Sequence, residues 1–389
     1  MTQPIIIIGA GLAGWTTARE LRKLDKTTPV RLITADSGDF YAKPSLSNAF
    51  AQKRGPAQLL TTPAASMAES QNVTLQAHTR VTAIDTASQT VHTSAGNFSY
   101  AQLVLATGAQ PIRIPMAGDA ASAVLSVNSW QDFSHFHERL TGDKVAAEVA
   151  DAKKHVVIMG AGLIGCEFAN DLICSGFAVT LVDPASRPIA ALLPTGLGGQ
   201  LLEALANQGV AWHLGTTVQS VDHQGETNSA FKVQLANGQT LVANVVLSAI
   251  GLRADLRLAQ AAGLLCERGI VVDARLQTSA PNVYALGDAA QYANGRTLPY
   301  VMPIMHAAKA LAATLAGQPT PVQFPLMPVA IKTPALPLVV AAAAPGTVGQ
   351  WSQSEPGVWL FTDETRAVKG FALSGKHTSR RAELAKQVV

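Results

Sequence analysis

The sequence predicts an α/β protein with two Rossmann-like dinucleotide-binding domains and a small C-terminal α+β domain. Residues 5–14 read IIIIGAGLAG and residues 156–165 read VVIMGAGLIG. In both places an apolar run typical of a buried parallel strand is followed at once by Gly-x-Gly-x-x-Gly. A helical pattern and a second apolar strand follow each copy, at Val30–Thr34 and Val179–Asp183. Two copies of one nucleotide-binding unit explain this repeat, because each motif is framed by a strand and a helix.

A later echo supports the repeat and sets the expected domain limits. The segment LVLATGAQP at 103–111 is matched by VVLSAIGLR at 245–253, which suggests that the second unit is inserted into the first. A linker follows a helix expected around 303–316 and is marked by Pro319, Pro321, Pro325 and Pro328. We therefore expect a discontinuous first domain over 1–112 and 247–320, an inserted domain over 113–246 and a C-terminal domain over 321–389.

Composition excludes several classes of protein. The chain has 389 residues, of which 48% are apolar and 14% charged, so it can bury large cores and is not a disordered protein. The net charge of +3 excludes a strongly basic nucleic-acid binder. Three cysteines in so long a chain argue against a secreted disulfide scaffold and against a Cys-only zinc site, and we expect no metal site.

The ends of the sequence predict a cytoplasmic location. The N-terminus runs directly into the strand pattern at Ile5–Ile8 without a basic, cleavable leader. The longest apolar run, Leu336–Ala344, covers about half of a bilayer span and contains Pro337. The C-terminal segment RRAELAKQVV is too short and polar for a membrane anchor.

Each glycine has a physical role in the two loops. The first permits the tight strand-to-helix turn, the second lets the backbone approach a pyrophosphate, and the third lets helix and strand pack closely. The helix N-terminus then offers unpaired N–H groups to the phosphates. The candidate residues are Gly9, Ala10, Gly11, Leu12, Ala13 and Gly14 in the first loop, and Gly160, Gly162, Leu163, Ile164 and Gly165 in the second.

Acidic residues after the second strands predict the cofactor preference. Asp183 ends the second strand of the second unit, where a carboxylate binds the adenosine ribose and repels a 2′-phosphate, so NADH is favoured over NADPH. Arg187, four residues later, could soften that choice. In the first unit the matching position is Thr34, followed by Ala35 and then by Asp36. Either Asp36 reaches a ribose from the turn or backbone groups replace it.

The segment VYALGDAA at 283–290 is a third marker. A short strand that ends in Gly-Asp before a helix suits a carboxylate bonded to a ribityl hydroxyl beside a flavin phosphate, and Asp288 is that carboxylate. A simple helix N-cap is the alternative for a lone Asp at this place.

Together these motifs resemble the two-domain pyridine nucleotide reductases that use FAD and NAD(P)H. GAGLAG, LVLATGA, GAGLIGCEFA, IGLR and ALGDA stand in the family's order over almost the whole chain. The segments YAKPSLSNAF (41–50), LPYVMPIMHAAKALAATLAG (298–317) and VAIKTPALPLVV (329–340) resemble the rubredoxin reductase branch. Flavorubredoxin reductases share much of this pattern. The resemblance implies electron transfer from NADH through FAD to rubredoxin, an acidic iron carrier, as in alkane hydroxylation.

The cysteine positions separate this branch from the disulfide reductases of the same fold. Those enzymes carry a redox-active Cys after the second strand, whereas residues 36–60 here contain no Cys. Cys166 and Cys174 are eight positions apart in a predicted helix and read as small buried hydrophobes. We therefore expect electrons to leave directly from the flavin, with no catalytic triad.

The resemblance also implies residues that tune the flavin. Lys43 stands where relatives carry an Arg near the flavin, and Asn48 stands where they carry the Lys that pairs with a Glu at flavin N5. Glu167 is expected to face the nicotinamide–flavin junction, although a solvated helix-start Glu is the alternative. Lys332 is expected to contact the flavin near N1, with an edge-strand charge as the alternative. The remaining cofactor contacts implied are Val81, Thr107, Gly108 and Val301 for FAD and Gly251 for NADH.

Three functions remain open at this stage. The first is an NADH:rubredoxin reductase that works as a monomer without nucleic acid. The second is the same chemistry serving a flavorubredoxin or a ferredoxin. The third is an NADH-responsive flavoprotein that binds a partner and turns over only incidentally.

Overall fold

The computed structural model describes residues 3–142, 153–225 and 230–389. The chain forms two compact units that each combine separate stretches of sequence. The first unit comprises Met1–Ala42, Leu60–Gln110 and Leu252–Met327, and the second comprises Lys43–Leu59, Pro111–Gly251 and Pro328–Val389.

A five-stranded parallel sheet forms the centre of the first unit. Its order is β20 (Val283–Ala285), β9 (Gln102–Leu105), β1 (Ile5–Ile8), β2 (Val30–Ile33) and β5 (Thr74–Gln76). All four residues of β1 are buried, as expected for a parallel strand with both faces covered. The predicted strands at 5–8 and 30–34 are thereby confirmed, the second ending one residue earlier.

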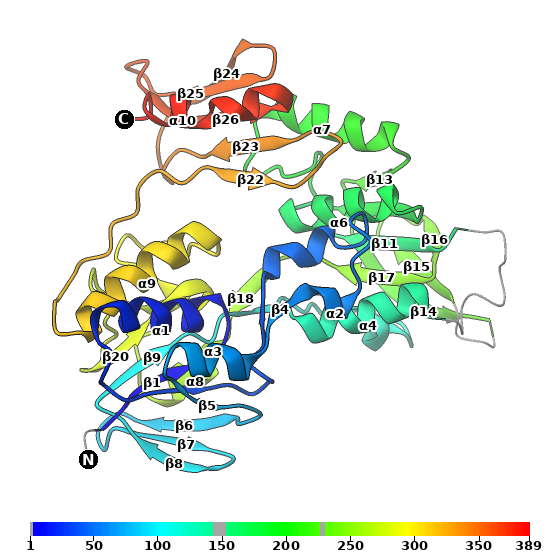
Figure 1. Cartoon of the computed structure of the whole chain (residues 1–389). Helices are drawn as coiled ribbons and strands as arrows, with labels where there is room; N and C mark the ends of the chain where they lie inside the picture. The colour runs from blue at the N-terminus through cyan, green and yellow to red at the C-terminus, as the bar shows by residue number, and fades with distance from the viewer. Residues whose placement is uncertain (1–2, 143–152, 226–229) are drawn as a thin grey trace. The chain divides into compact units, whose positions relative to one another are not determined.

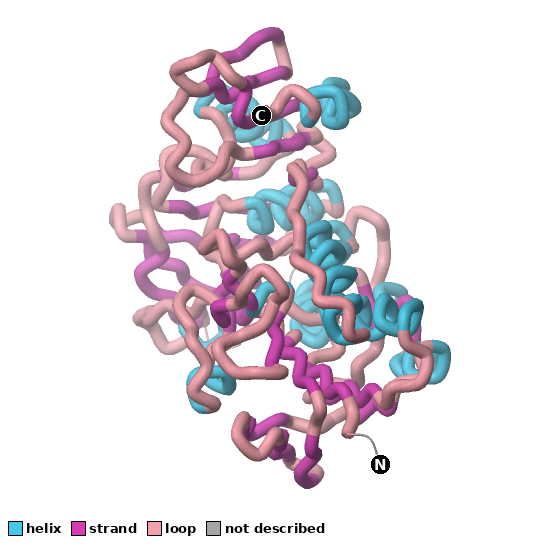
Figure 2. The backbone as a smooth tube through the Cα atoms, turned by 90° about the vertical axis from the view of Figure 1, so that its left-hand side faces the viewer, coloured by secondary structure: helices cyan, strands magenta, loops and turns pink. Residues whose placement is uncertain are grey.

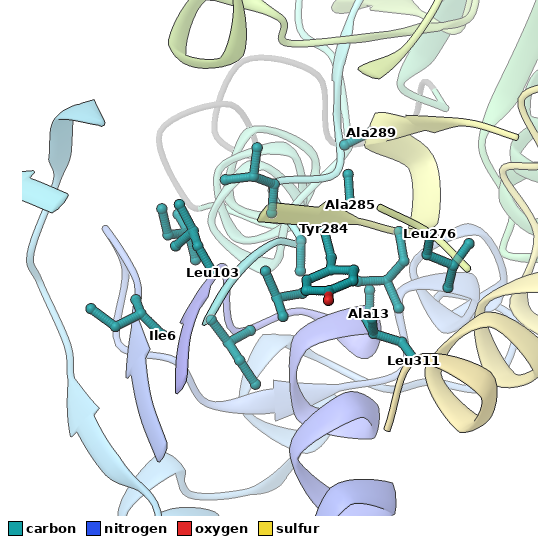
Figure 3. Packing of buried hydrophobic residues seen from close by; sticks show 14 of the residues in the cluster. Ile6, Ala13, Leu103, Leu276, Tyr284, Ala285, Ala289 and Leu311 are labelled. Carbon is teal, nitrogen blue, oxygen red and sulfur yellow. The ribbon is translucent and has the colours of Figure 1, made fainter. Parts of the chain in front are cut away.

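Two helices pack against each other beside this sheet. α1 (Leu12–Leu24) and α9 (Val301–Leu315) lie side by side in Figure 1. Figure 3 shows how Ile6, Leu103 and Tyr284 of three neighbouring strands share one buried cluster with Ala13 of α1 and Leu311 of α9. The helix expected around 303–316 is confirmed as α9.

Shorter elements complete the first unit. β6, β7 and β8 form an antiparallel meander, and α8 packs against β6. The bounds are β3 (Phe40–Tyr41), β4 (Leu60–Thr62), α3 (Ala64–Ser70), β6 (Val81–Asp85), β7 (Thr90–Thr93), β8 (Gly96–Ser99), β10 (Ala109–Pro111), β18 (Leu252–Ala254), α8 (Arg257–Ala261), β19 (Ile270–Val271), η3 (Gly287–Ala289) and β21 (Ala290–Gln291).

The second unit repeats the strand–loop–helix pattern. Its parallel sheet has the order β13 (Ala211–Leu214), β12 (Ala178–Asp183), β11 (His155–Met159) and β17 (Val245–Ser248). The other elements of this part are η2 (Ala121–Ala123), α4 (Trp130–Thr141), α6 (Leu163–Cys174), α7 (Thr195–Asn207) and the antiparallel strands β14 (Val218–Gln224), β15 (Ala230–Leu235) and β16 (Thr240–Ala243).

Residues 43–59 fold with the second unit although they interrupt the sequence of the first. They form η1 (Lys43–Asn48) and α2 (Pro56–Leu59). Phe50 packs among the rings of Phe133, Phe136 and Phe177, with centroids 5.6–5.8 Å apart. This aromatic cluster holds the end of η1 beside α4.

The C-terminal part of the chain forms a small antiparallel sheet. Its order is β22 (Val329–Ile331), β23 (Leu338–Ala341), β26 (Val368–Ser374), β25 (Val358–Thr362) and β24 (Gln350–Glu355), and η4 (Gly375–Arg380) and α10 (Arg381–Ala385) follow it. The C-terminus lies beside these strands in Figure 2. The Val389 amide donates to the Val368 carbonyl of β26. Within the described ranges, no helix is both long enough and apolar enough to cross a bilayer.

Candidate functional site

The two glycine loops have nearly the same backbone. Gly9 and Gly160, which directly follow β1 and β11, adopt φ angles of +110° and +100°. Gly11 and Gly162 are the N-caps of α1 and α6, with φ/ψ of −78°/−170° and −73°/−171°. The repeat in the sequence is therefore a repeat in conformation.

Packing explains why the first and third glycines are needed. A Cβ on Gly9 would lie 2.3 Å from the Ala106 carbonyl oxygen, and one on Gly14 would lie 1.9 Å from the Gly9 carbonyl oxygen. Gly165 has the same relation to Gly160, also at 1.9 Å. These are backbone atoms that cannot move aside. A side chain at Gly9 would push away the segment after β9, and one at Gly14 or Gly165 would separate the helix from the turn before it.

The second glycines are different, and they show that both loops fit a dinucleotide. A Cβ on Gly11 or on Gly162 meets no atom of the described chain within 4 Å. No side chain in the described ranges caps α1 or α6, and neither helix has an acidic residue in its first turn. Each loop therefore presents open space and uncapped N–H groups, which is the environment that a pyrophosphate requires. Ala10, Leu12 and Ala13 belong to the first of these turns, and Leu163 and Ile164 to the second.

Asp183 joins the glycine loop of the second unit to the end of β12. Its Oδ2 accepts the Ala161 N–H at 2.6 Å and its Oδ1 accepts the Ala185 N–H at 2.7 Å. The carboxylate thus stands beside the loop, as the sequence predicts. Arg187 donates from Nη2 to the Ala190 carbonyl at 3.0 Å, so the guanidinium that could soften the NADH preference is engaged within its own loop.

The corresponding turn of the first unit is built differently. The Thr34 hydroxyl donates to Asp36 Oδ1 at 2.6 Å, and the same oxygen accepts the Gly38 N–H at 3.0 Å. The Trp15 indole N–H of α1 donates to the Gly38 carbonyl at 2.9 Å. Asp36 itself is exposed, as is Ala35, so the turn presents a carboxylate next to the glycine loop.

Asp288 lies half-buried within η3, directly after β20. The N-cap of η3 is Leu286, so the helix-cap interpretation of Asp288 is wrong for this short helix. The Gly287 N–H donates to the Tyr292 hydroxyl at 3.2 Å. Burial raises the pKa of Tyr292 to about 12, which keeps this phenol neutral. The other expected FAD contacts of the first unit are Val81 at the start of β6, Thr107 and Gly108 after β9, and Val301 at the start of α9.

The second unit contains a buried ion pair that joins distant segments. Nζ of Lys332, the residue that follows β22, lies 2.7 Å from Glu167 Oε2 on α6. The Ser47 hydroxyl of η1 donates to the same carboxylate oxygen at 2.6 Å. The Lys332 backbone N–H donates to Glu167 Oε1 at 3.0 Å. Glu167 is only 1% exposed, and its lysine partner 31%.

This arrangement rules out the alternative interpretation of each residue and leaves its expected flavin role a prediction. Glu167 is buried and paired, so the solvated helix-start interpretation is wrong. Lys332 follows an edge strand, but its ammonium is turned to Glu167 rather than left as a free edge charge. Asn48 stands at the end of η1, and Lys332 supplies the lysine partner that Asn48 cannot. Lys43 begins the same 3-10 helix.

Two further residues of α6 were missed from the sequence. Asp171 accepts the N–H groups of Phe50 and Ala51 at 3.0 and 2.8 Å, and Asn170 Oδ1 accepts the Ala335 N–H at 3.0 Å. Both side chains are buried, and burial raises the pKa of Asp171 against the effect of its backbone donors. Polar residues three and four positions after Glu167 in an apolar helix were the available signal.

The three cysteines differ in burial. Cys166 is fully buried, Cys266 is half-buried and Cys174 is exposed, so the expectation of two buried helix cysteines is confirmed only for Cys166. Burial raises the pKa of the Cys166 thiol far above its usual range and also raises that of Cys266.

We expect a single thiol of the folded protein to react rapidly with Ellman's reagent at pH 8. That thiol is Cys174, because the thiolate is the reactive form and the other two groups are hindered. Cys174→Ser should remove the fast phase, and Cys166 should react only after unfolding in guanidinium. A fast phase that persists in Cys174→Ser would contradict this assignment.

Comparison with known proteins decides the family. The family described as pyridine nucleotide-disulphide oxidoreductase matches residues 3–314, which is most of the chain. The chain belongs to this family. A second match, to the rubredoxin binding C-terminal domain, covers residues 321–388. Members of the family use FAD and NAD(H), in agreement with the two uncapped glycine loops.

Relatives in the family match the chain from end to end. The rubredoxin-NAD(+) reductase of Alcanivorax borkumensis is 42% identical over 99% of this chain and 98% of its own length. A nitric oxide reductase FlRd-NAD(+) reductase of Aeromonas hydrophila is 39% identical over 100% of this chain and 97% of its own length.

Solved structures support the same fold. The covalent putidaredoxin reductase–putidaredoxin complex contains a chain 27% identical, with a TM-score of 0.84 over 99% of this chain and 91% of that chain. A ferredoxin reductase from Rhodopseudomonas palustris is 25% identical, with a TM-score of 0.85 over 100% of this chain and 95% of that chain. The predicted α/β class with two dinucleotide-binding domains is confirmed.

Proposed function

We propose that this chain is an NADH-dependent flavoprotein reductase that passes electrons from NADH through FAD, one at a time, to rubredoxin. The match of residues 321–388 to a rubredoxin-binding domain carries this proposal, because it concerns the acceptor and not only the cofactors. A relative named rubredoxin-NAD(+) reductase, 42% identical over almost the full length, supports it. Supply of electrons to an alkane hydroxylase system is the corresponding physiological role.

The two glycine loops divide the cofactors between the predicted domains in this proposal. FAD binds at the first loop with residues 1–112 and 247–320, NADH binds at the second with residues 113–246, and residues 321–389 form the carrier interface. When bound, FAD would supply the redox chemistry, because a flavin can accept a hydride and can release electrons singly. The chain binds and orients: Gly11 and Gly162 admit the pyrophosphates, and Asp183 favours NADH.

In this scheme Glu167 holds the Lys332 ammonium in a fixed position and balances most of its charge. The Lys332 side chain remains 31% exposed, so part of it is available to contact a ligand, while the buried carboxylate holds the ammonium in place. Beside a bound flavin, this ammonium would tune the redox properties of the ring. Lys43 serves the same cofactor, and Gly251 serves the nicotinamide nucleotide.

Anaerobic stopped-flow kinetics test the function. The FAD-loaded protein is reduced with NADH or with NADPH and then mixed with rubredoxin or, separately, with ferredoxin. We expect fast bleaching by NADH and fast rubredoxin reduction, with NADPH and ferredoxin slow. Fast bleaching without rubredoxin reduction would refute rubredoxin as the electron acceptor but would still agree with FAD and NADH as the cofactors.

A flavorubredoxin is the second candidate acceptor. The observation that favours it is the 39% identity to a FlRd-NAD(+) reductase over the full chain. The same stopped-flow experiment with a flavorubredoxin as acceptor separates the two candidates. The better acceptor is the one that reaches half of its maximal reduction rate at the lower concentration. Slow turnover with every carrier and a stable charge-transfer complex would instead favour an NADH-responsive binding protein.

We expect Arg381 to contribute more than Arg380 to the encounter with an acidic carrier. Arg380 is ion-paired with Glu355 and Glu383, so its charge is largely compensated, whereas Arg381 is exposed. Arg381→Gln should lower the rate of rubredoxin reduction about two- to fivefold at low salt, with little effect at high salt.

The reduction of ferricyanide by the same Arg381→Gln variant serves as the control. Its rate should be unchanged, because a small inorganic acceptor does not need the docking surface. An equal loss in both assays, or a larger loss in Arg380→Gln, would refute the role of Arg381.

The proposed setting is a cytoplasmic monomer. The monomer is the state expected for a C-terminal domain as small as residues 321–389.

A further inference from the structure

We propose that Ser47 is a positioning residue that holds the Glu167–Lys332 pair in its observed arrangement. The Ser47 hydroxyl donates to Glu167 Oε2 at 2.6 Å and accepts from Lys332 Nζ at 2.8 Å. Nζ and Oε2 are themselves 2.7 Å apart. The three atoms form a closed triangle of hydrogen bonds, in which the hydroxyl is the only group that both donates and accepts.

The ammonium of Lys332 is oriented by three partners. An ammonium has three N–H groups. Here Lys332 Nζ donates to the Pro44 carbonyl, to the Ser47 hydroxyl and to the Glu167 carboxylate. Two of these partners, Pro44 and Ser47, belong to η1. The direction of the positive charge is therefore set by η1 as much as by Glu167.

Ser47 and the segment that follows it are held in place by burial and by hydrogen bonds to α6. Ser47 is buried, with 3% of its surface exposed, so water does not readily replace its hydroxyl. The chain just after it is held by Asp171, which accepts the backbone N–H groups of Phe50 and Ala51. Helix α6 thus carries both the carboxylate of the pair and the acceptor that fixes the segment bearing Ser47.

Ser47→Ala removes the hydroxyl corner of the triangle and leaves both charged groups in place. Hydrogen bonds to charged groups are strong enough for their loss to raise the released population of Lys332 about tenfold. The released ammonium is more exposed and reacts faster with an amine reagent. This inference rests on the proposed function only where the Glu167–Lys332 pair is given a role beside the flavin. The labelling of Lys332 tests the position of the ammonium by itself, because it is measured without NADH or a carrier.

The experiment is acetylation of the flavin-loaded protein with sulfo-NHS acetate, followed by peptide mass spectrometry. We expect the rate at Lys332 to rise about tenfold in Ser47→Ala relative to the exposed Lys309 of the same sample. Ser45→Ala, in the same 3-10 helix, is the matched control and should leave the rate at the wild-type value. Ser47→Thr restores the hydroxyl and should restore protection.

An unchanged Lys332 rate in a folded Ser47→Ala protein would overturn the proposal, and so would equal rises in Ser47→Ala and Ser45→Ala. If Ser47→Ala does not fold, Ser47→Cys replaces it, because a thiol is a weaker donor and acceptor. An intermediate rate then supports the proposal, and the wild-type rate refutes it. The rate of flavin reduction by NADH is measured in parallel. Faster labelling of Lys332 together with a normal rate of flavin reduction would support the positioning role of Ser47. It would also show that the Glu167–Lys332 pair is not needed for the proposed function.

Discussion

Lys332→Met should lower the free energy of unfolding by about 3 kcal/mol, the cost of leaving a buried carboxylate without its cation. Glu167 is 1% exposed, and methionine keeps the apolar stem of the lysine while removing its charge. The Ser47 hydroxyl and the Lys332 backbone N–H remain as donors, which keeps the loss at the lower end of the range for broken buried pairs. Urea unfolding of the holoprotein measures the change.

A double variant shows whether the stranded charge is the cause. Glu167→Gln combined with Lys332→Met removes both charges and keeps an acceptor for the backbone N–H, so it should recover most of the lost stability. Lys309→Met changes an exposed lysine of α9 and should stay within about 0.5 kcal/mol of the wild type. A double variant no more stable than Lys332→Met would show that packing, and not the unpaired carboxylate, causes the loss.

Gly11→Ala and Gly162→Ala should separate the two cofactors. Each added methyl group points into the space where no atom of the described chain lies within 4 Å, so the fold is undisturbed and the ligand is obstructed. Gly11→Ala should yield folded but colourless protein, with FAD affinity lower by about two orders of magnitude. Gly162→Ala should yield yellow protein that NADH reduces only at far higher concentration.

The flavin absorbance of the purified proteins and NADH titration by stopped-flow measure these effects. Gly199→Ala, an exposed position in α7 that also has open space around it, is the matched control. It should keep both cofactors and gain helix stability of up to about 1 kcal/mol. Loss of flavin in Gly162→Ala, or yellow Gly11→Ala protein, would reverse or refute the assignment of FAD to the first loop.

Local requirements of the backbone explain why the glycine loops could be predicted. A strand, a turn with positive φ and a closely packed helix occupy about ten consecutive residues, so the sequence of Ile5–Gly14 alone carries the information. The same holds for 156–165. The cofactor-loop part of the candidate site therefore follows from the sequence, including Asp183 beside its loop.

The ion pair could not be predicted in the same way. Glu167 and Lys332 are 165 residues apart, and the hydroxyl of Ser47 reaches Glu167 from 120 residues away. The resemblance suggested a lysine partner near position 48, where this chain has Asn48. Only the tertiary structure shows that Lys332, which follows β22, is the lysine that pairs with Glu167 of α6.

The sequence by itself determined the two dinucleotide loops, the α/β class and the expected cofactors, because these depend on short segments whose backbone needs are local. The tertiary structure alone decided which charges are paired, as in Arg380 with Glu355, and which thiol is exposed. Charge pairing and burial depend on segments that meet only after folding. No pattern within one segment can therefore specify them.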